Sequence, residues 1–255
     1  MNSIKLSAAD WCFFPKLGDP AHYYDTLKRL GIDGAEMVDS SRYAAARSAG
    51  LEIVTMSGPG MTRGLNHREH HTDLIPQLRD AIQHASQNKI PILIVFSGNR
   101  AGQAVTEGIA NCRRGFEAVL PEAEQAKVIL GFEMLNTNDH PDYQADRGHY
   151  GFELAEAINF PWFKLVYDIY HMERMGDNSA VDIVNHLVSI THLHVAEYPR
   201  RSCPQADGNI RYNQIVPAIV KAGFRGYWGL EYIPAENTLD ELPEAVALFR
   251  RLSAG

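Results

Sequence analysis

The sequence predicts an α/β protein folded as a single (β/α)8 barrel, a TIM barrel, over residues 1–255. Short apolar runs alternate with longer amphipathic runs along the whole chain, and eight such pairs fill a length typical of one barrel, about 250 residues. No glycine-rich dinucleotide-binding motif follows the first apolar run. That absence favours a closed barrel over an open doubly wound sheet, and we expect one domain.

The predicted strands are short apolar runs bounded by turn residues. The clearest is Ile90–Phe96, which stops at Ser97-Gly98-Asn99. In chain order, the expected strands are Ile4–Phe14, Gly34–Val38, Leu51–Ser57, Ile90–Phe96, Val128–Leu135, Phe163–Tyr170, Ile190–Ala196 and Tyr227–Ile233.

The predicted helices carry apolar residues at helical spacing. In chain order, they are Ala21–Leu30, Ser40–Ala49, Thr72–Asn88, Thr106–Ala126, Tyr150–Ile158, Ser179–Val188, Tyr212–Ala222 and Leu239–Leu252. Gly31, Gly50 and Gly223 directly follow three of them, and glycine is a common residue just past the end of a helix. Strands that alternate with helices indicate parallel strands joined by right-handed crossovers.

Composition limits the classes of partner. A chain with 45% hydrophobic and 22% charged residues is typical of a soluble globular protein, and a net charge of −7 disfavours a nucleic-acid partner. Cys12, Cys112 and Cys203 lie far apart without a CxxC pair, which indicates a reducing compartment rather than a disulfide framework. No export signal or membrane span is seen, so we expect a cytoplasmic protein without a membrane partner. A homo-oligomer is left open.

Four polar side chains lie near the ends of four consecutive predicted strands, about one strand–helix unit apart. They are Glu133, Asp168, His194 and Glu231. The active site of a barrel of this kind lies at the carboxyl ends of its strands, so we expect these side chains to face one space. Three carboxylates there repel each other unless a cation joins them, although any one residue alone is equally well explained as an interior ion pair or a helix cap. The mainly oxygen-donor set suits one divalent cation, Mn²⁺, Mg²⁺ or Co²⁺.

The segments LNTNDHPDYQAD, KLVYDIYHMERMGD, THLHVAEYPRR and GYWGLEYIP resemble hydroxypyruvate isomerases and their relatives in the xylose-isomerase-like barrel superfamily. That superfamily also contains the ketose 3-epimerases. The resemblance covers most of the chain and is specific from about residue 130 to 234. By position, it implies that the metal ligands are Glu133, Asp168, His194 and Glu231.

The resemblance also implies roles in catalysis and substrate binding. Glu133 and Glu231 match the acid and base of the family, and His171 and Arg200 match substrate-binding positions of the ketose epimerases. A cation can stabilise an enediolate while two flanking carboxylates move the proton. The expected reaction is the isomerisation of hydroxypyruvate, or of a close hydroxy-keto acid, to tartronate semialdehyde or its counterpart. Which glutamate is the base stays open.

Several alternatives remain at this point. A ketose 3-epimerase of the tagatose or psicose type, a keto-sugar or keto-inositol dehydratase, and a non-catalytic sugar-binding barrel would all fit the scaffold. Asp139 stands where the epimerases carry glutamate, and some hydroxypyruvate isomerases carry glutamine where this chain has His194. An arginine can bind a substrate carboxylate in bidentate fashion, for which Arg200 is the candidate and Arg201 the competitor. A DNA-repair endonuclease is disfavoured because it needs more histidine ligands and a basic groove.

Four further features have no assigned role. The histidine-rich segment Asn66–His71 is interpreted as a solvated loop over the active site, with a metal role as the less favoured reading. Trp11, Phe13 and Phe14 form either an apolar wall over the substrate or part of the core. The loop Asn136–His149 is long enough to be functional, and Glu197 is a weak candidate for supporting His194.

Overall fold

The computed structural model describes residues 4–235 and 238–254 and contains a closed barrel of parallel strands. The strands follow one another around the barrel in chain order. They are β1 (Lys5–Ala9), β2 (Gly34–Glu36), β3 (Glu52–Ser57), β4 (Ile92–Val95), β5 (Ile129–Glu133), β6 (Phe163–Asp168), β7 (Ile190–Val195) and β8 (Tyr227–Leu230). The predicted fold class is confirmed.

Two compact units make up the chain. The first unit comprises residues 1–54, 178–187 and 192–255, and it holds β1, β2, β8 and most of β7. The second unit comprises residues 55–177 and 188–191, and it holds β4, β5 and β6. The expectation of one domain stays a prediction.

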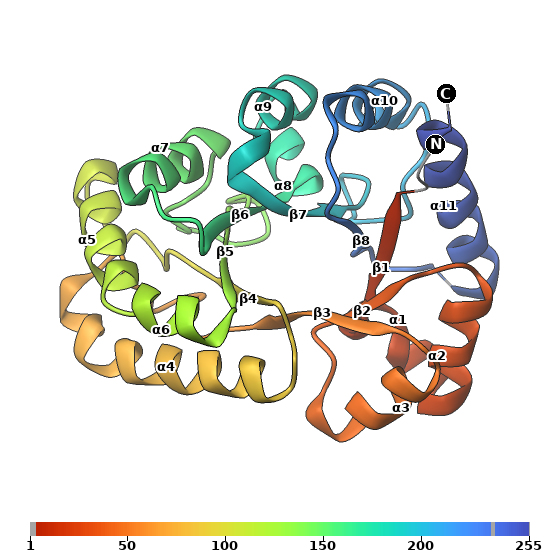
Figure 1. Ribbon diagram of the computed structural model, residues 1–255. Coiled ribbons are helices and arrows are strands. Elements are labelled where there is room, and N and C mark those ends of the chain that lie inside the picture. Colours follow the sequence, from red (N-terminus) through yellow and green to blue (C-terminus); the bar gives the residue numbers. More distant parts are fainter. Residues whose placement is uncertain (1–3, 236–237, 255) are drawn as a thin grey trace. The chain divides into compact units, whose positions relative to one another are not determined.

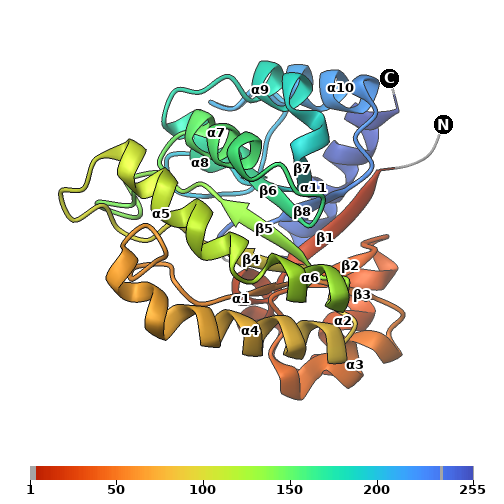
Figure 2. The same ribbon diagram turned by 60° about the vertical axis from the view of Figure 1, so that its left-hand side comes forward.

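The first unit contains six α-helices among its described residues, with α9 packed beside α10 (Figure 2). They are α1 (Asp10–Leu17), α2 (Pro20–Arg29), α3 (Tyr43–Ser48), α9 (Ser179–Asn185), α10 (Tyr212–Ala222) and α11 (Thr238–Ser253). Asp19 begins α2 by accepting a hydrogen bond from the backbone N–H of His22 at 2.8 Å. Gly223 ends α10 in the left-handed conformation, with φ of 94°, as its position predicted.

The expected first strand, Ile4–Phe14, is wrong in its second half. The strand ends at Ala9, and Asp10–Leu17 forms α1. The Asp10 carboxylate accepts from the Tyr24 hydroxyl at 2.6 Å and pairs with Arg42 at 3.2 Å, so contacts with α2 and with the residue before α3 fix the start of the helix. A short apolar run does not by itself distinguish a strand from a helix.

The second unit contains five α-helices among its described residues, and α4 and α6 lie side by side (Figure 1). They are α4 (His71–Gln87), α5 (Val105–Glu117), α6 (Leu120–Ala126), α7 (Gly148–Ile158) and α8 (Ile169–Arg174). The single helix expected over Thr106–Ala126 is therefore two helices. Pro121 lacks a backbone N–H and its ring clashes with the carbonyl four residues earlier, so α5 ends at Glu117 and α6 starts again with the proline in its first turn.

Each unit has its own apolar core. In the second unit, Phe132 of β5 packs against Phe116 and Phe163, while in the first unit Trp228 of β8 packs against Phe224 and Phe249. The three cysteines are free thiols. Within the described residues, no helix combines the length and apolar character needed to cross a membrane.

Candidate functional site

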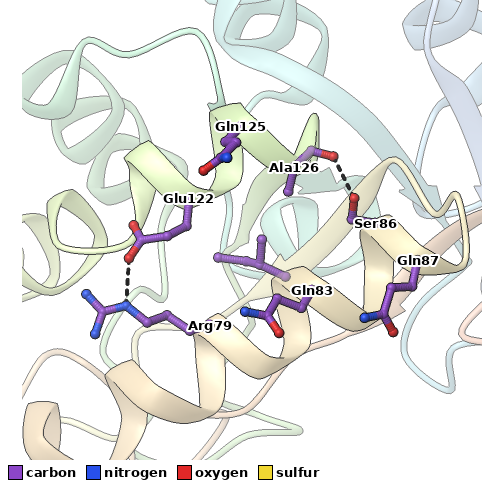
Figure 3. Close-up of a pocket in the computed structure, with 8 residues that line it drawn as sticks. Arg79, Gln83, Ser86, Gln87, Glu122, Gln125 and Ala126 are labelled. Carbon is purple, nitrogen blue, oxygen red and sulfur yellow. Dashed lines mark hydrogen bonds and ion pairs between the residues drawn. The ribbon is translucent and has the colours of Figure 1, made fainter.

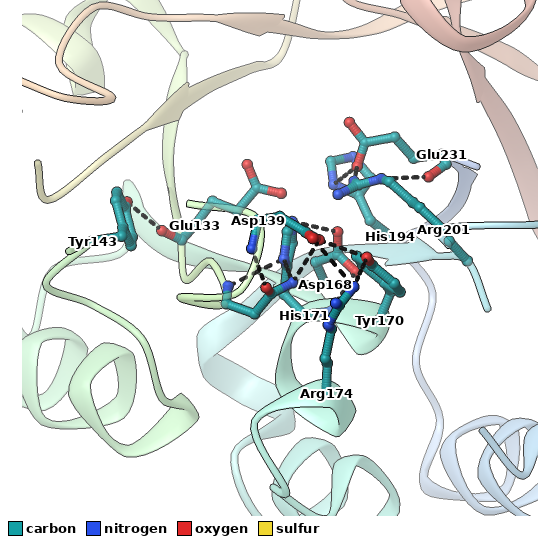
Figure 4. Close-up of polar contacts among 12 residues, drawn as sticks. Glu133, Asp139, Tyr143, Asp168, Tyr170, His171, Arg174, His194, Arg201 and Glu231 are labelled. Carbon is teal, nitrogen blue, oxygen red and sulfur yellow. Dashed lines mark hydrogen bonds and ion pairs between the residues drawn. The ribbon is translucent and has the colours of Figure 1, made fainter. Parts of the chain in front are cut away.

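His194 and Glu231 come together in the first unit. His194 is near the end of β7, and Glu231 directly follows β8, which pairs with β7. One oxygen of Glu231, Oε1, accepts from Trp11 Nε1–H at 2.9 Å. The other, Oε2, accepts from Arg201 Nη2 and lies 3.0 Å from His194 Nδ1 (Figure 4). Both oxygens of this carboxylate are thus held in place.

The second nitrogen of His194 faces a carboxylate that the sequence did not single out. Glu36, the last residue of β2, lies with Oε2 at 3.1 Å from His194 Nε2 and 2.9 Å from His192 Nε2. Its other oxygen accepts from the Ser7 hydroxyl at 2.6 Å. Burial acts to raise the pKa of Glu36, but the His192 and His194 imidazoles outweigh it and hold that pKa well below its usual range. A glutamate in the short apolar strand Gly34–Glu36 was the signal that could have pointed to it.

Glu133 and Asp168 are the last residues of β5 and β6, which are neighbouring strands of the second unit. The Tyr143 hydroxyl donates to the Glu133 carbonyl at 2.9 Å and accepts from the Ser97 backbone N–H at 2.9 Å, which ties the end of β5 to the end of β4. Asp168 begins α8 by accepting from the backbone N–H of His171 at 3.2 Å. An aspartate at a helix start satisfies a backbone donor that the helix itself leaves unpaired.

His171 is a residue of α8, not of the loop after a strand, because the predicted strand Phe163–Tyr170 ends at Asp168. Its side chain is buried, and its Nδ1 accepts from the backbone N–H of Asn136 at 3.1 Å. That hydrogen bond leaves the proton on Nε2, which lies 3.4 Å from Asp168 Oδ2. Nε2–H can therefore donate to Asp168 or to a substrate oxygen. The substrate-binding role of His171 stays a proposal.

Asp139 is held by the helix that follows Asp168. Its carboxylate accepts from the Tyr170 hydroxyl at 2.5 Å and pairs with Arg174 at 3.1 Å, while Asn136 Nδ2 donates to it at 3.0 Å (Figure 4). Burial, together with the hydrogen bond to Asp139, raises the pKa of Tyr170 to about 12, so this hydroxyl stays protonated and donates near neutral pH. The first part of the loop Asn136–His149 is thus fastened to α8 by charged contacts.

Arg201, not Arg200, is the arginine beside Glu231. The Arg200 side chain is exposed, whereas Arg201 is 13% exposed and donates through Nε to the Glu231 carbonyl at 3.0 Å. The reason is local: paired backbone hydrogen bonds between Glu197 and Ser202 close a tight loop, in which Arg201 adopts the left-handed conformation with φ of 52°. The substrate-binding role expected for Arg200 stays a prediction.

Glu197 supports its own loop. Its Oε1 accepts from the backbone N–H groups of Tyr198 and Ile210, at 3.0 and 3.1 Å.

Two aromatic residues of α1 lie in different environments. Trp11 is 46% exposed and donates to Glu231, while Phe13 is fully buried against Tyr232. Trp11 thus contributes a polar donor, and Phe13 belongs to the core.

The histidines of Asn66–His71 bind loop carbonyls. His67 Nε2 lies 3.1 Å from the carbonyl of Arg100, His70 Nδ1 lies 3.0 Å from that of Gly64, and His71 Nε2 lies 2.8 Å from that of Leu65. In the part of the chain that the structure describes, no set of three or more metal-capable side chains includes them. Their contacts favour a structural role in this loop.

A hollow of about 460 Å³ lies between α4 and α6 in the second unit (Figure 3). An Arg79–Glu122 ion pair at 2.7 Å crosses it, and the Ser86 hydroxyl donates to the Ala126 carbonyl at 3.0 Å. Its lining includes none of the side chains that we expected to carry chemistry.

Comparisons with known proteins agree with the barrel fold. The model of a family described as "Xylose isomerase-like TIM barrel" matches residues 24–252. A mouse protein that is provisionally named a hydroxypyruvate isomerase is 24% identical over 95% of this chain and 94% of its own length.

Two solved structures share the fold. An AP endonuclease of family 2 from Brucella melitensis has a TM-score of 0.81 at 19% identity, covering 94% of this chain and 96% of its own. A 3-keto-D-glucoside 4-epimerase from E. coli has a TM-score of 0.80 at 18% identity, covering 97% of this chain and 99% of its own. At these identities, the two structures indicate the fold and not the reaction.

Proposed function

This chain belongs to the xylose isomerase-like TIM-barrel family, and from that premise we propose that it is a metal-dependent isomerase of a small hydroxy-keto acid. The substrate that we propose is hydroxypyruvate or a close analogue. The observation that carries the proposal is the set of three carboxylates and one imidazole at the ends of four consecutive strands. The isomerase name of the full-length relative supports the reaction class.

We propose that Glu133, Asp168, His194 and Glu231 bind one divalent cation. These four side chains each offer a ligand atom, and together they form a set that could hold a metal ion. The donor chemistry fits a hard or borderline cation, Mn²⁺, Mg²⁺ or Co²⁺, because three of the four donors are carboxylate oxygens. When bound, such a cation would stabilise negative charge that develops on the oxygens of the substrate.

The two glutamates would carry the proton. One carboxylate removes a proton from C3 of hydroxypyruvate, and the other glutamate, protonated, returns one to C2. The hydroxyl proton on O3 is lost as the proton on O2 is gained, so C3 becomes the aldehyde and no atoms are added or lost. A carboxylate and a carboxylic acid can act as general base and general acid when they flank the reacting carbons.

Arg201 is the group that we propose for the carboxylate of the substrate. Arg201 donates to the backbone carbonyl and the side chain of Glu231, and the planar fork of a guanidinium matches the geometry of a carboxylate. The centroid of the Trp11 ring lies 5.5 Å from the Arg201 guanidinium carbon, within the range of a cation–π contact. An acid substrate is further favoured because the Asp139 carboxylate, at the position of the epimerase glutamate, is engaged by Tyr170 and Arg174.

The test is turnover by protein stripped of metal with EDTA and then supplied with Mn²⁺ or Mg²⁺. We expect no isomerisation of hydroxypyruvate without a cation, and restored activity with deuterium entering at C2 when the reaction runs in D₂O. The comparison substrates are fructose, tagatose and their 3-epimers. A higher kcat/KM for the ketoses would make the protein an epimerase, the second candidate suggested by the structural likeness to an epimerase. Absence of exchange with every substrate would contradict enediolate chemistry.

A further inference from the structure

We propose that Glu36 is a positioning residue: it fixes the proton of His194 on Nε2 so that Nδ1 is left as a metal ligand. This inference rests on the proposed metal site. It concerns a carboxylate from β2 that belongs neither to the four proposed ligands nor to the proposed substrate-binding groups.

The two nitrogens of His194 face two different carboxylates. Nε2 lies 3.1 Å from Glu36 Oε2, and Nδ1 lies 3.0 Å from Oε2 of Glu231. A neutral imidazole has one donor nitrogen and one acceptor nitrogen. If Nδ1 is to offer its lone pair to a cation beside Glu231, the proton must stay on Nε2, where Glu36 accepts it. A carboxylate in this position also makes the imidazole a stronger ligand.

The Glu36 carboxylate is itself held in place by contacts with side chains from β1 and β7 of the first unit. Ser7 from β1 donates to Oε1 at 2.6 Å, and His192 Nε2 from β7 lies 2.9 Å from Oε2. Gly229 of β8 leaves the room: a Cβ atom there would lie 2.2 Å from Glu36 Oε1 and 2.8 Å from His194 Cδ2. Glu36, His192 and His194 are completely buried. An ionised side chain is expensive to bury, so a carboxylate with this many partners indicates a dedicated role.

Glu36, His192 and His194 also form a second set that could hold a metal ion. We favour the positioning role because Oε2 of Glu36 already lies within hydrogen-bond distance of both imidazoles and Oε1 is taken by Ser7. The two interpretations predict different numbers of cations bound per chain. The positioning role requires one cation per chain, and a Glu36 metal site requires two.

The decisive variant is Glu36→Gln, which keeps the side-chain volume and removes the charge. Mn²⁺ binding to metal-free protein is measured by isothermal titration calorimetry, with folding checked by circular dichroism. We expect one ion per chain for the wild type and a Kd raised about 10- to 100-fold in the variant, the effect usual for removing such a partner of a ligand histidine. The matched control is Asp10→Asn, which removes another buried carboxylate of the same unit, one that binds Tyr24 and Arg42. Its Kd should stay within about twofold of the wild type, whatever its stability.

A second readout reports the tautomer directly. Histidine labelled with ¹⁵N in protein loaded with Mg²⁺ should show His194 protonated at Nε2 and unprotonated at Nδ1. In Glu36→Gln we expect this preference to weaken. If that variant does not fold, Ser7→Ala takes its place, with a Kd raised a few-fold, and the wild-type spectrum still decides the tautomer.

An unchanged Kd in Glu36→Gln, a wild-type His194 protonated at Nδ1 in the loaded protein, or two bound ions per chain would each overturn the positioning role. Those results leave the proposed isomerase standing. A wild-type protein that binds no cation removes the proposed metal site, and the positioning role is overturned with it.

Discussion

The two units hold the proposed metal ligands by different means. In the first unit, His194 and Glu231 are fixed by side chains remote in sequence: Glu36 from β2, Trp11 from α1 and Arg201 from the loop after β7. In the second unit, Asp168 is fixed by the helix that it begins, through the backbone N–H three residues later. The first part depends on long-range charged contacts, and the second on a helix start.

This difference has a consequence for mutational sensitivity. Removing a distant partner in the first unit should disturb a metal ligand that is itself unchanged, because a ligand histidine depends on the group bound to its other nitrogen. In the second unit, the cap is made by Asp168 itself, so its position depends on few other side chains. The predictions below test that contrast, in order of decreasing effect.

The largest effect is expected for the two glutamates, one from each unit. Glu133→Gln and Glu231→Gln should each lower kcat at least about 10²-fold at saturating metal, because each loses an acid or base. Glu231→Gln should also weaken Mn²⁺ binding more than Glu133→Gln, since it breaks the ion pair with Arg201 and removes the anion facing His194 Nδ1. Steady-state kinetics and calorimetry on both variants check this. Near wild-type turnover in either would rule out the two-glutamate mechanism.

A smaller effect is expected at the arginine pair. Arg201→Ala should raise KM for hydroxypyruvate about 10- to 100-fold, the range for losing a hydrogen bond to a charged group. Arg200→Ala is the matched control, and its exposed side chain predicts little change. Dihydroxyacetone carries a neutral group in place of the carboxylate and serves as the comparison substrate. If Arg201 binds the carboxylate, Arg201→Ala should affect hydroxypyruvate alone, whereas damage to Glu231 should affect both substrates. A loss confined to Arg200→Ala would restore the expectation drawn from the sequence.

The smallest effect compares two barrel glycines. Gly229→Ala places a methyl group against Glu36 and His194, and Gly131→Ala on β5 places one 2.8 Å from Val166 Cγ2 and 2.9 Å from Ile92 Cγ2. Both should lower the free energy of unfolding by about 1–3 kcal/mol, as overpacked cores do. Only Gly229→Ala should weaken Mn²⁺ binding as well. Denaturant unfolding and calorimetry give the two quantities, and equal metal affinity in the two variants would remove the contrast between the units.

The sequence by itself determined the order and type of most elements. Apolar run length and helical spacing identified the eight strands, because burial imposes these periods locally. Strand order in a barrel follows chain order, so Glu133, Asp168, His194 and Glu231 could be assigned to consecutive strand ends without coordinates. The break at Pro121 was also readable in principle, since its cause lies within one helical turn.

The tertiary structure alone decided the partners of those side chains. Glu36 and His194 lie 158 residues apart, and no spacing rule joins them. Likewise, the choice of Arg201 over Arg200 depends on a loop closed between Glu197 and Ser202, which turns one of two adjacent arginines toward Glu231. Local sequence sets which face of a strand a residue occupies. Which side chains then meet depends on the register between strands and on the space left by a residue such as Gly229.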